Sequence, residues 1–489
     1  MQALFPPQFT GLTFALFLLA PFLFQTVHAQ PPSPAPDPHE FPPVSLPKDI
    51  NRFGTGIQRT MTLLATSTPE KRNTVRVLFY GQSITEQKWS YDVADWLRKS
   101  YPNANLIIEN RAIGGHSSQL LWRTAEADLY PFEPDLLIFH VYGSHTDYEK
   151  LIANVRTRTT AEVLIQTDHI VKPEELEEPT ELPKQNGAIW SQWMSRVFLP
   201  DLAKRYDMEL LDQRVEWQRY LRENHLEPKR LLKDSVHLND WGCFVMAELV
   251  KQHLRYLPKA PKSKWQGLAR DFRVGEDVHW KDGRLVLEFE GNRADVILDQ
   301  RAQRKAGDSP THTSVLIDGK PPSQHPELFA TTRASAYPNS NWPIIKRVTL
   351  RGSPLVEDWT AKIFDASEDG KLFKFEVIGS KTGEDGMGSS DKLFLSNSGR
   401  IAIEPEDWNL EYCKAVFKGA IPKDLATHWK AIPQFVDEFE ATDKIDLKIE
   451  QAITLARGLS NGVHRLELKA TGTPPSIQSI RVYKPPFKL

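Results

Sequence analysis

Three residues of the types that together perform nucleophilic catalysis stand at two places in the chain. Ser83 follows a β-branched and aromatic run, 75–80, that is broken by Gly81. Asp234 and His237 form a D-x-x-H pair ahead of a helix-like stretch. A serine hydroxyl is a weak nucleophile that needs a neighbouring base, and the base needs an acid that fixes its tautomer. Because the carboxylate of a D-x-x-H turn can reach Nδ1 of its imidazole, the sequence predicts Ser83 as nucleophile, His237 as base and Asp234 as orienting acid.

The position of Ser83 favours chemistry over a plain turn. The run 75–80 predicts a buried parallel strand, and open α/β sheets bind ligands at the carboxyl ends of such strands. The alternative is a strand-to-helix turn in which Ser83 only caps the next helix, and a D-x-x-H spacing occurs by chance in many chains. The order along the chain supports the catalytic interpretation, since Asp234 and His237 follow the last strand predicted before residue 258.

Together these two stretches resemble the SGNH (GDSL-like) hydrolase family. The resemblance implies a three-layer α/β/α domain with a parallel sheet, an acyl-serine mechanism, and no metal or organic cofactor. It also implies that Gly115, in the turn 110–117, offers its backbone N–H to the developing oxyanion. The alternative for this segment is a tight turn into a helix capped by Ser117, which Gly114 would serve equally.

The third family block departs from the pattern at His145. The family has G-x-N here, and its asparagine donates a hydrogen bond to the oxyanion, whereas this chain has Gly143, Ser144 and His145. An imidazole can also donate a hydrogen bond, so His145 is predicted to replace the asparagine in the oxyanion hole. It could equally contact the substrate, or mark a chemistry other than ester hydrolysis.

Four further residues are predicted to bind substrate near the rim of this site. Gln82 stands where the family usually has aspartate, and relatives similar to sialate-O-acetylesterases share its G-Q-S turn. His116 follows the glycine of the oxyanion turn, and Asp168 and His169 follow the fourth predicted strand. For His116, Asp168 and His169 an ordinary polar loop position is an equally good interpretation.

Other classes of site find no support in the sequence. No Cys/His cluster has zinc spacing, and neither a phosphate-binding loop nor a dinucleotide fingerprint follows a predicted strand, so no metal or cofactor is expected. Trp89 and Trp122 could form a sugar-stacking wall, although tryptophans at such positions more often pack helices. With 61 basic and 63 acidic residues, the chain has no overall charge that would favour nucleic acid. Two cysteines, Cys243 and Cys413, make no disulfide scaffold, and their pairing stays open.

Composition divides the chain into four parts. Residues 1–29 resemble a secretory signal with cleavage after Ala29, and 30–50 is a proline-rich linker. Residues 51–258 alternate short apolar strands with amphipathic helices, which predicts a parallel sheet covered on both faces. Residues 263–489 contain many short strands separated by turn dipeptides, which predicts a β-sandwich or jelly roll, as one large or two small domains.

These expectations combine into one function. The resemblance implies a secreted or periplasmic serine hydrolase that removes acyl groups, acetyl above all, from a carbohydrate, with no nucleic-acid partner and no membrane span in the mature chain. Two alternatives are a glycan-binding protein on a catalytically altered fold, and a glycosidase in which Asp147 and Asp168 matter more than Ser83. All proposed chemistry precedes residue 258, so the first domain is expected to hydrolyse small esters alone.

Overall fold

The computed structural model describes residues 41–177, 181–185, 190–262, 265–299, 312–335, 341–415, 417, 419–440 and 448–488. The predicted signal segment, 1–29, and residues 30–40 of the predicted linker lie outside the described residues. The chain from Val44 onward forms one compact unit. Among the described helices, none combines the length and the apolar character needed to cross a membrane.

A five-stranded parallel sheet forms the centre of the first part, as predicted. Its strands are β1 (Thr74–Gly81), β2 (Asn105–Asn110), β3 (Leu136–His140), β4 (Glu162–Gln166) and β5 (Glu209–Leu211), in the order β2-β1-β3-β4-β5. Every pairing is parallel. Strands β3 and β4 are buried along their whole length, which agrees with the apolar runs 136–139 and 163–165 within them. The carboxyl end of β1, which leads to Ser83, therefore lies beside that of β3.

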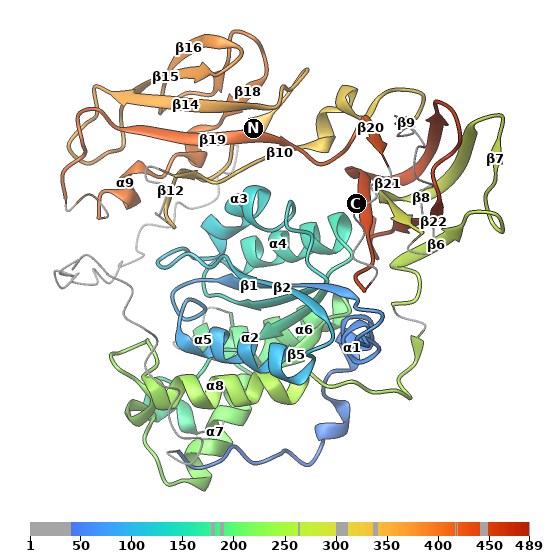
Figure 1. The fold of residues 1–489 in the computed structure, drawn as a ribbon. Helices are drawn as coiled ribbons and strands as arrows, with labels where there is room; N and C mark the ends of the chain where they lie inside the picture. The colour runs from blue at the N-terminus through green and yellow to red at the C-terminus, as the bar shows by residue number, and fades with distance from the viewer. Residues whose placement is uncertain are drawn as a thin grey trace, which may run out of the picture. The chain divides into compact units, whose positions relative to one another are not determined.

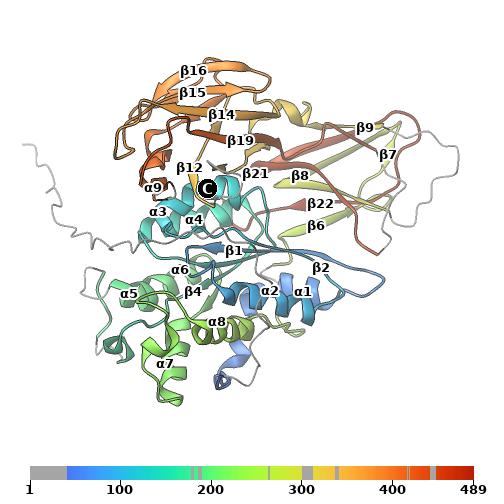
Figure 2. The same cartoon turned by 60° about the vertical axis from the view of Figure 1, so that its left-hand side comes forward.

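Helices cover both faces of this sheet (Figure 1). One face carries α1 (Gln58–Ala65), α2 (Lys88–Ser100), α7 (Gln213–Glu223) and α8 (Asp240–His253). The other face carries α3 (Ser118–Asp128), α4 (His145–Arg158) and α6 (Leu199–Arg205). The short helix α5 (Trp190–Trp193) and the π-helical turn η4 (Met194–Phe198) lead directly into α6. Figure 2 shows α3 and α4 on one side of the sheet and α1, α2 and α8 on the other. The α/β/α fold class predicted from the sequence is confirmed.

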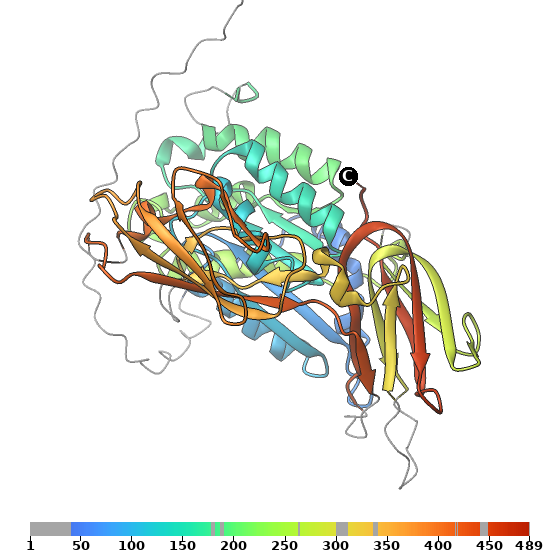
Figure 3. The ribbon, with the colours of Figure 1, turned by 90° about the horizontal axis from the view of Figure 1, so that it is seen from above.

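The rest of the chain forms antiparallel sheets around two separate hydrophobic cores. The first β unit comprises β6 (Ala269–Arg273), β7 (Trp280–Lys281), β8 (Arg284–Leu298), β9 (His312–Ile317), β20 (Glu438–Glu440), β21 (Ala452–Ala470) and β22 (Ile477–Tyr483). Its sheet order is β20-β9-β21-β8-β22-β6, with β7 paired to β8. The long strands β8 and β21 run side by side in Figure 3, one yellow-green and one red.

The second β unit is inserted in the chain between β9 and β20 of the first. It comprises β10 (Phe329–Thr331), β11 (Ala334–Ser335), β12 (Pro343–Ile345), β13 (Thr349–Leu350), β14 (Glu357–Phe364), β15 (Lys374–Gly379), β16 (Gly383–Ser389), β17 (Phe394–Leu395), β18 (Ile401–Ile403), β19 (Ala426–Pro433) and the short helix α9 (Leu410–Cys413). The division into one large or two small β domains stays a prediction, although the strands of the two units pack around separate hydrophobic cores. Cys243 and Cys413 are both buried free thiols.

Buried ion pairs join the second β unit to helix α3. Asp407, whose side chain is 1% exposed, lies 2.6 Å from Arg123 of α3 and 3.1 Å from Arg347. Arg333 likewise lies 2.9 Å from the buried carboxylate of Asp128, at the end of α3. Since a buried charge is costly without its partner, these contacts couple the two parts of the molecule energetically. Helix α3 directly follows the turn that carries Gly115.

Candidate active site

The turn that carries Ser83 is shaped by close packing at the end of β1. A Cβ atom on Gly81 would collide with the carbonyl oxygen of His140 and with the hydroxyl of Thr85, so only glycine fits there. The turn is also held from β2, because the side-chain amide of Asn110 donates to the carbonyl of Thr85 at 2.7 Å. Ser83 itself is partly exposed. The nucleophile predicted from the sequence thus stands on a braced and accessible turn.

Ser83, His237 and Asp234 lie in a continuous hydrogen-bonded chain. Nε2 of His237 lies 2.9 Å from Oγ of Ser83, and Nδ1 of His237 lies 2.9 Å from Oδ2 of Asp234. An ionised carboxylate only accepts hydrogen bonds, so Nδ1 of His237 carries the proton and donates it. Nε2 is then free to accept from the serine hydroxyl, which is the arrangement that a general base requires.

Asp234 also organises the turn in which it stands. Its Oδ1 accepts hydrogen bonds from the backbone N–H groups of Val236 and His237, at 2.8 and 2.7 Å. Burial disfavours the charged carboxylate, but these hydrogen bonds and the His237 ring outweigh it and hold the pKa of Asp234 below its ordinary value. The carboxylate therefore stays ionised at neutral pH and can stabilise an imidazolium at His237.

Two backbone N–H groups are available to stabilise an oxyanion. Within the described residues, neither the N–H of Ser83 nor that of Gly115 has a hydrogen-bond acceptor. The neighbouring N–H of Gly114 is occupied, since it donates to Oε1 of Glu86 at 2.9 Å. Gly115 has a φ of 75°, and a Cβ atom there would lie 3.2 Å from the ring of Trp342, a residue of the second β unit. That unit therefore borders the predicted oxyanion turn.

The contacts of His145 lie toward residues 185–198. His145 begins α4, and its ring packs edge-on against Trp193 and Phe198, with ring centres 5.2 and 5.5 Å away. Its Nε2 lies 3.1 Å from the side-chain amide nitrogen of Gln185, which donates to it. For the residues that the structure describes, no contact joins His145 to Ser83 or the Gly115 turn. These contacts favour the alternative that His145 meets substrate at the rim.

His116 is fully buried, so in this conformation its ring has no surface to offer a substrate. Its Nδ1 lies 3.3 Å from the carbonyl of Gly114 and its Nε2 accepts from the side-chain amide of Asn409 at 3.2 Å. Desolvation lowers the pKa of His116 to about 4, which keeps the imidazole neutral. The histidine predicted to bind substrate thus joins the oxyanion turn to the second β unit.

Asp168 and His169 belong to a polar cluster at the ends of β3 and β4. Oδ1 of Asp168 accepts a hydrogen bond from Tyr142 and lies 3.7 Å from Nε2 of His140 and 3.2 Å from Nδ1 of His169. His169 is fully buried, and its Nε2 lies 2.9 Å from the carbonyl oxygen of Val236. In this conformation its ring is closed to a substrate.

The same cluster is the one place in the described part of the chain where three ligand-type side chains could meet one metal ion. The ligand atoms of His140, Asp168 and His169 all lie within 4.8 Å of one another. A histidine that binds metal normally donates its other ring N–H to an acceptor. Here Nδ1 of His140 is buried with no hydrogen-bond partner among the described residues. Nδ1 of His140 therefore lacks the acceptor that would orient the ring if Nε2 bound a metal ion.

The remaining predicted positions have ordinary structural surroundings. Gln82 is partly exposed, and its carbonyl oxygen accepts from the N–H of Thr85 at 2.8 Å. Trp89 is fully buried in the core. Trp122 is 8% exposed, and the cations of Arg123, Lys150 and Arg347 lie over its ring. Neither tryptophan offers a free face for sugar stacking.

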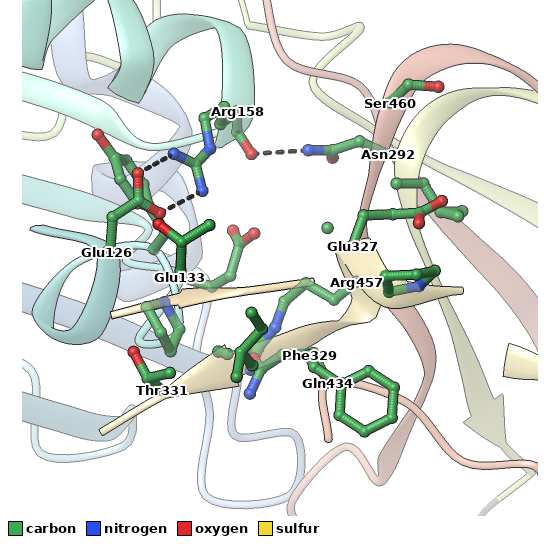
Figure 4. A pocket seen from close by; sticks show the side chains of 18 of the residues that line it. Glu126, Glu133, Arg158, Asn292, Glu327, Phe329, Thr331, Gln434, Arg457 and Ser460 are labelled. Atoms are coloured by element: carbon green, nitrogen blue, oxygen red, sulfur yellow. Dashed lines mark hydrogen bonds and ion pairs between the residues drawn. The ribbon is translucent and has the colours of Figure 1, made fainter. Parts of the chain in front are cut away.

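A cavity of about 880 Å³ contains none of the predicted site residues. It is lined by residues of α3, α4 and both β units, among them Glu126 and Arg158, which form an ion pair (Figure 4). Arg457, Glu327 and Asn292 are among the lining residues on the opposite side, and the side-chain amide of Asn292 donates to the carbonyl of Arg158. Because charges of both signs are paired or interspersed there, the cavity indicates no particular ligand.

Several residues that shape the site carried no signal in the sequence. Gln87 bonds to the backbone of Leu238, next to His237, through both its amide nitrogen and its oxygen, at 2.8 and 3.0 Å. Trp342 and Asn409 reach the oxyanion turn from the second β unit. Asn110 begins the turn 110–117 that the family resemblance singles out, and its side chain holds the Ser83 turn at the carbonyl of Thr85.

Comparisons with known proteins yield only distant structural similarity. No protein-family model matches the chain, and no curated protein matches its sequence. A two-domain esterase active on acetylated mannans is similar at 14% identity over 87% of this chain and 95% of that chain, with a TM-score of 0.32. An acetylxylan esterase from Geobacillus stearothermophilus is 15% identical over 38% of this chain and 97% of that chain, with a TM-score of 0.32. A GDSL-like lipase from Parabacteroides merdae is 15% identical over 38% of this chain and 98% of that chain, also with a TM-score of 0.32. Similarity of this size assigns neither a family nor an activity to this chain.

Proposed function

We propose that this chain is an exported serine esterase that removes acetyl groups from a carbohydrate through an acyl-serine intermediate. The observation that carries the proposal is the chain of two 2.9 Å contacts from Ser83 through His237 to Asp234. Nucleophile, base and orienting acid are then all within hydrogen-bond reach, with the serine accessible. The contacts of Asp168 with Tyr142, His140 and His169 leave it without the exposed position that a glycosidase acid would need.

In this reaction Oγ of Ser83 attacks the ester carbonyl while Nε2 of His237 takes the hydroxyl proton. The N–H groups of Ser83 and Gly115 are the proposed donors to the oxyanion of the tetrahedral intermediate. The imidazolium of His237 then protonates the leaving sugar oxygen, and an acetyl-serine remains. A water molecule attacks this ester with His237 again as base, which releases acetate and restores Ser83.

The carbohydrate part of the proposal rests on the G-Q-S turn around Gln82 and on the second β unit, which borders the site through Trp342 and Asn409. The mannan and xylan esterases named above define the substrates to test first. Purified protein is incubated with acetylated mannan, acetylated xylan, an acetylated sialic acid and a long-chain acyl ester, and released acid is quantified. We expect acetate from at least one acetylated glycan and little release from the long-chain ester. Cleavage of glycosidic bonds without acetate release would contradict the proposal.

A further inference from the structure

We infer that His169 is a positioning residue that holds the turn carrying the proposed base His237. Its Nε2 lies 2.9 Å from the carbonyl oxygen of Val236, the residue directly before His237. A carbonyl oxygen only accepts hydrogen bonds, so Nε2 of His169 donates. This inference rests on the proposed function for its catalytic consequence, although the contact itself is independent of any activity.

The turn needs support from outside because it is exposed. Asp234 and His237 have side chains that are 47% and 34% exposed. Two side chains from elsewhere in the domain hold the backbone on either side of His237. His169 holds Val236 before it, and Gln87 holds Leu238 after it through two hydrogen bonds of 2.8 and 3.0 Å. The imidazole of His237 is thus fixed relative to Ser83 from both directions along the chain.

His169 is itself packed in the interior of the domain. Its ring is fully buried and packs against Trp217 with ring centres 5.5 Å apart. Its other nitrogen, Nδ1, lies 3.2 Å from Oδ1 of Asp168. Burial opposes the charge on Asp168, but contacts with His140 and His169 outweigh it, and the pKa of Asp168 lies well below its ordinary value. A fixed carboxylate therefore faces one side of the ring, and the Val236 carbonyl faces the other.

The contact matters because the base has to stay within hydrogen-bond distance of the nucleophile. A displacement of about 1 Å at a catalytic group can lower turnover by about a hundredfold. Within the described residues no hydrogen bond or ring contact joins His169 to Ser83 or His237, so its effect passes through the backbone of Val236. We propose this positioning role for His169 in place of the substrate-binding role that the sequence suggested.

The test compares His169→Leu with His169→Gln in the full chain. The glutamine amide can donate from nearly the same place as Nε2, whereas leucine cannot donate. We expect His169→Leu to lower kcat for acetate release by about tenfold to a hundredfold with a smaller change in KM. We expect His169→Gln to recover most of the lost kcat.

The control variant is His140→Gln, which alters the same cluster without touching Val236. It should leave kcat within about threefold of the wild type. Equal losses in all three variants would assign the effect to packing of the cluster and overturn the inference.

A second readout does not depend on activity. Hydrogen exchange followed by mass spectrometry reports the backbone amides of residues 233–239 in the same proteins. We expect faster exchange there in His169→Leu and near wild-type exchange in His169→Gln. Unchanged exchange in a folded His169→Leu protein would overturn the inference, whether or not the chain is an esterase. Faster exchange in His169→Leu, combined with no ester hydrolysis by the wild type, would uphold the positioning role and refute the proposed function instead.

Discussion

The side-chain amide of Asn409 donates a hydrogen bond to Nε2 of His116, 3.2 Å away and 293 residues earlier in the chain. His116 stands beside Gly115, so this bond ties the second β unit to the proposed oxyanion turn. Asn409 is also buried, and its amide nitrogen donates in addition to the carbonyl of Pro343 at 2.9 Å. Nε2 of His116 therefore has its hydrogen-bond donor only when the second β unit is in place.

The burial of His116 makes stability depend on pH. The pKa of His116 is lowered from 6.5 to about 4 in the folded protein, so on acidification the unfolded chain takes up a proton that the folded chain refuses. The contribution is fully present above about pH 6.5 and falls as the pH drops toward 4. We expect the stability of the wild type relative to His116→Gln to decrease by about 2–3 kcal/mol between pH 7.5 and 4.5.

Urea denaturation of both proteins at the two pH values measures this difference. The comparison with the variant removes the contributions of other titrating groups that the two proteins share. An identical pH dependence in both proteins would show that His116 is not held neutral at this interface.

Asp407 is expected to be critical for stability. Its carboxylate contacts both Arg123 and Arg347 and is almost fully buried, so Asp407→Ala leaves two arginines without their partner. Breaking a buried ion pair costs about 3–5 kcal/mol. The control is Asp358→Ala, since Asp358 forms an ion pair with Lys430 in which both side chains are more than 60% exposed. That change should cost less than about 1 kcal/mol. Chemical denaturation measures both, and similar losses would contradict the proposed coupling.

We expect that removal of both β units abolishes ester hydrolysis. The sequence, in contrast, predicted that the first domain would hydrolyse small esters alone. A chain ending at residue 262 would expose the carboxylate of Asp128, the ring of His116 and the face of Trp122, which contact Arg333, Asn409 and Arg347 in the full chain. We expect this shortened chain to lose its cooperative unfolding transition and its hydrolysis of a small aryl acetate. A soluble fragment with the kcat of the full chain would show that the first domain is independent after all.

His145 separates two roles that the sequence left open. Its ring contacts Trp193, Phe198 and Gln185, which favours a substrate contact at the rim over the oxyanion hole. We therefore expect His145→Ala to raise KM for a glycan ester several-fold while kcat stays within about threefold. Steady-state kinetics on the polymer and on an aryl acetate give both constants. A loss in kcat of about a hundredfold that His145→Asn restores would place the side chain in the oxyanion hole instead.

Much of the first domain follows from local patterns in the sequence. The run 75–80 predicted β1 because it is rich in β-branched and aromatic residues, and the alternation of short apolar strands with amphipathic helices over residues 51–258 predicted the parallel sheet. Ser83, Asp234 and His237 were found because their chemistry depends on residue type and on short spacings. The partners that hold them were not found, because the contact of His169 with Val236 and that of Asn409 with His116 join residues far apart in the chain. Such contacts leave no periodicity or spacing in the sequence.

The central claim is that Ser83 is a nucleophile activated by His237. A fluorophosphonate probe reacts with an activated serine, and intact-protein mass spectrometry followed by peptide mapping locates the adduct. We expect one adduct on Ser83 in the wild type, none in a folded Ser83→Ala protein, and labelling at least about a hundredfold slower in His237→Ala. Turnover of an aryl acetate by Ser83→Ala should fall by about a thousandfold or more. A folded wild-type protein that the probe leaves unlabelled at Ser83, or equal labelling of the Ser83→Ala protein, would contradict the account.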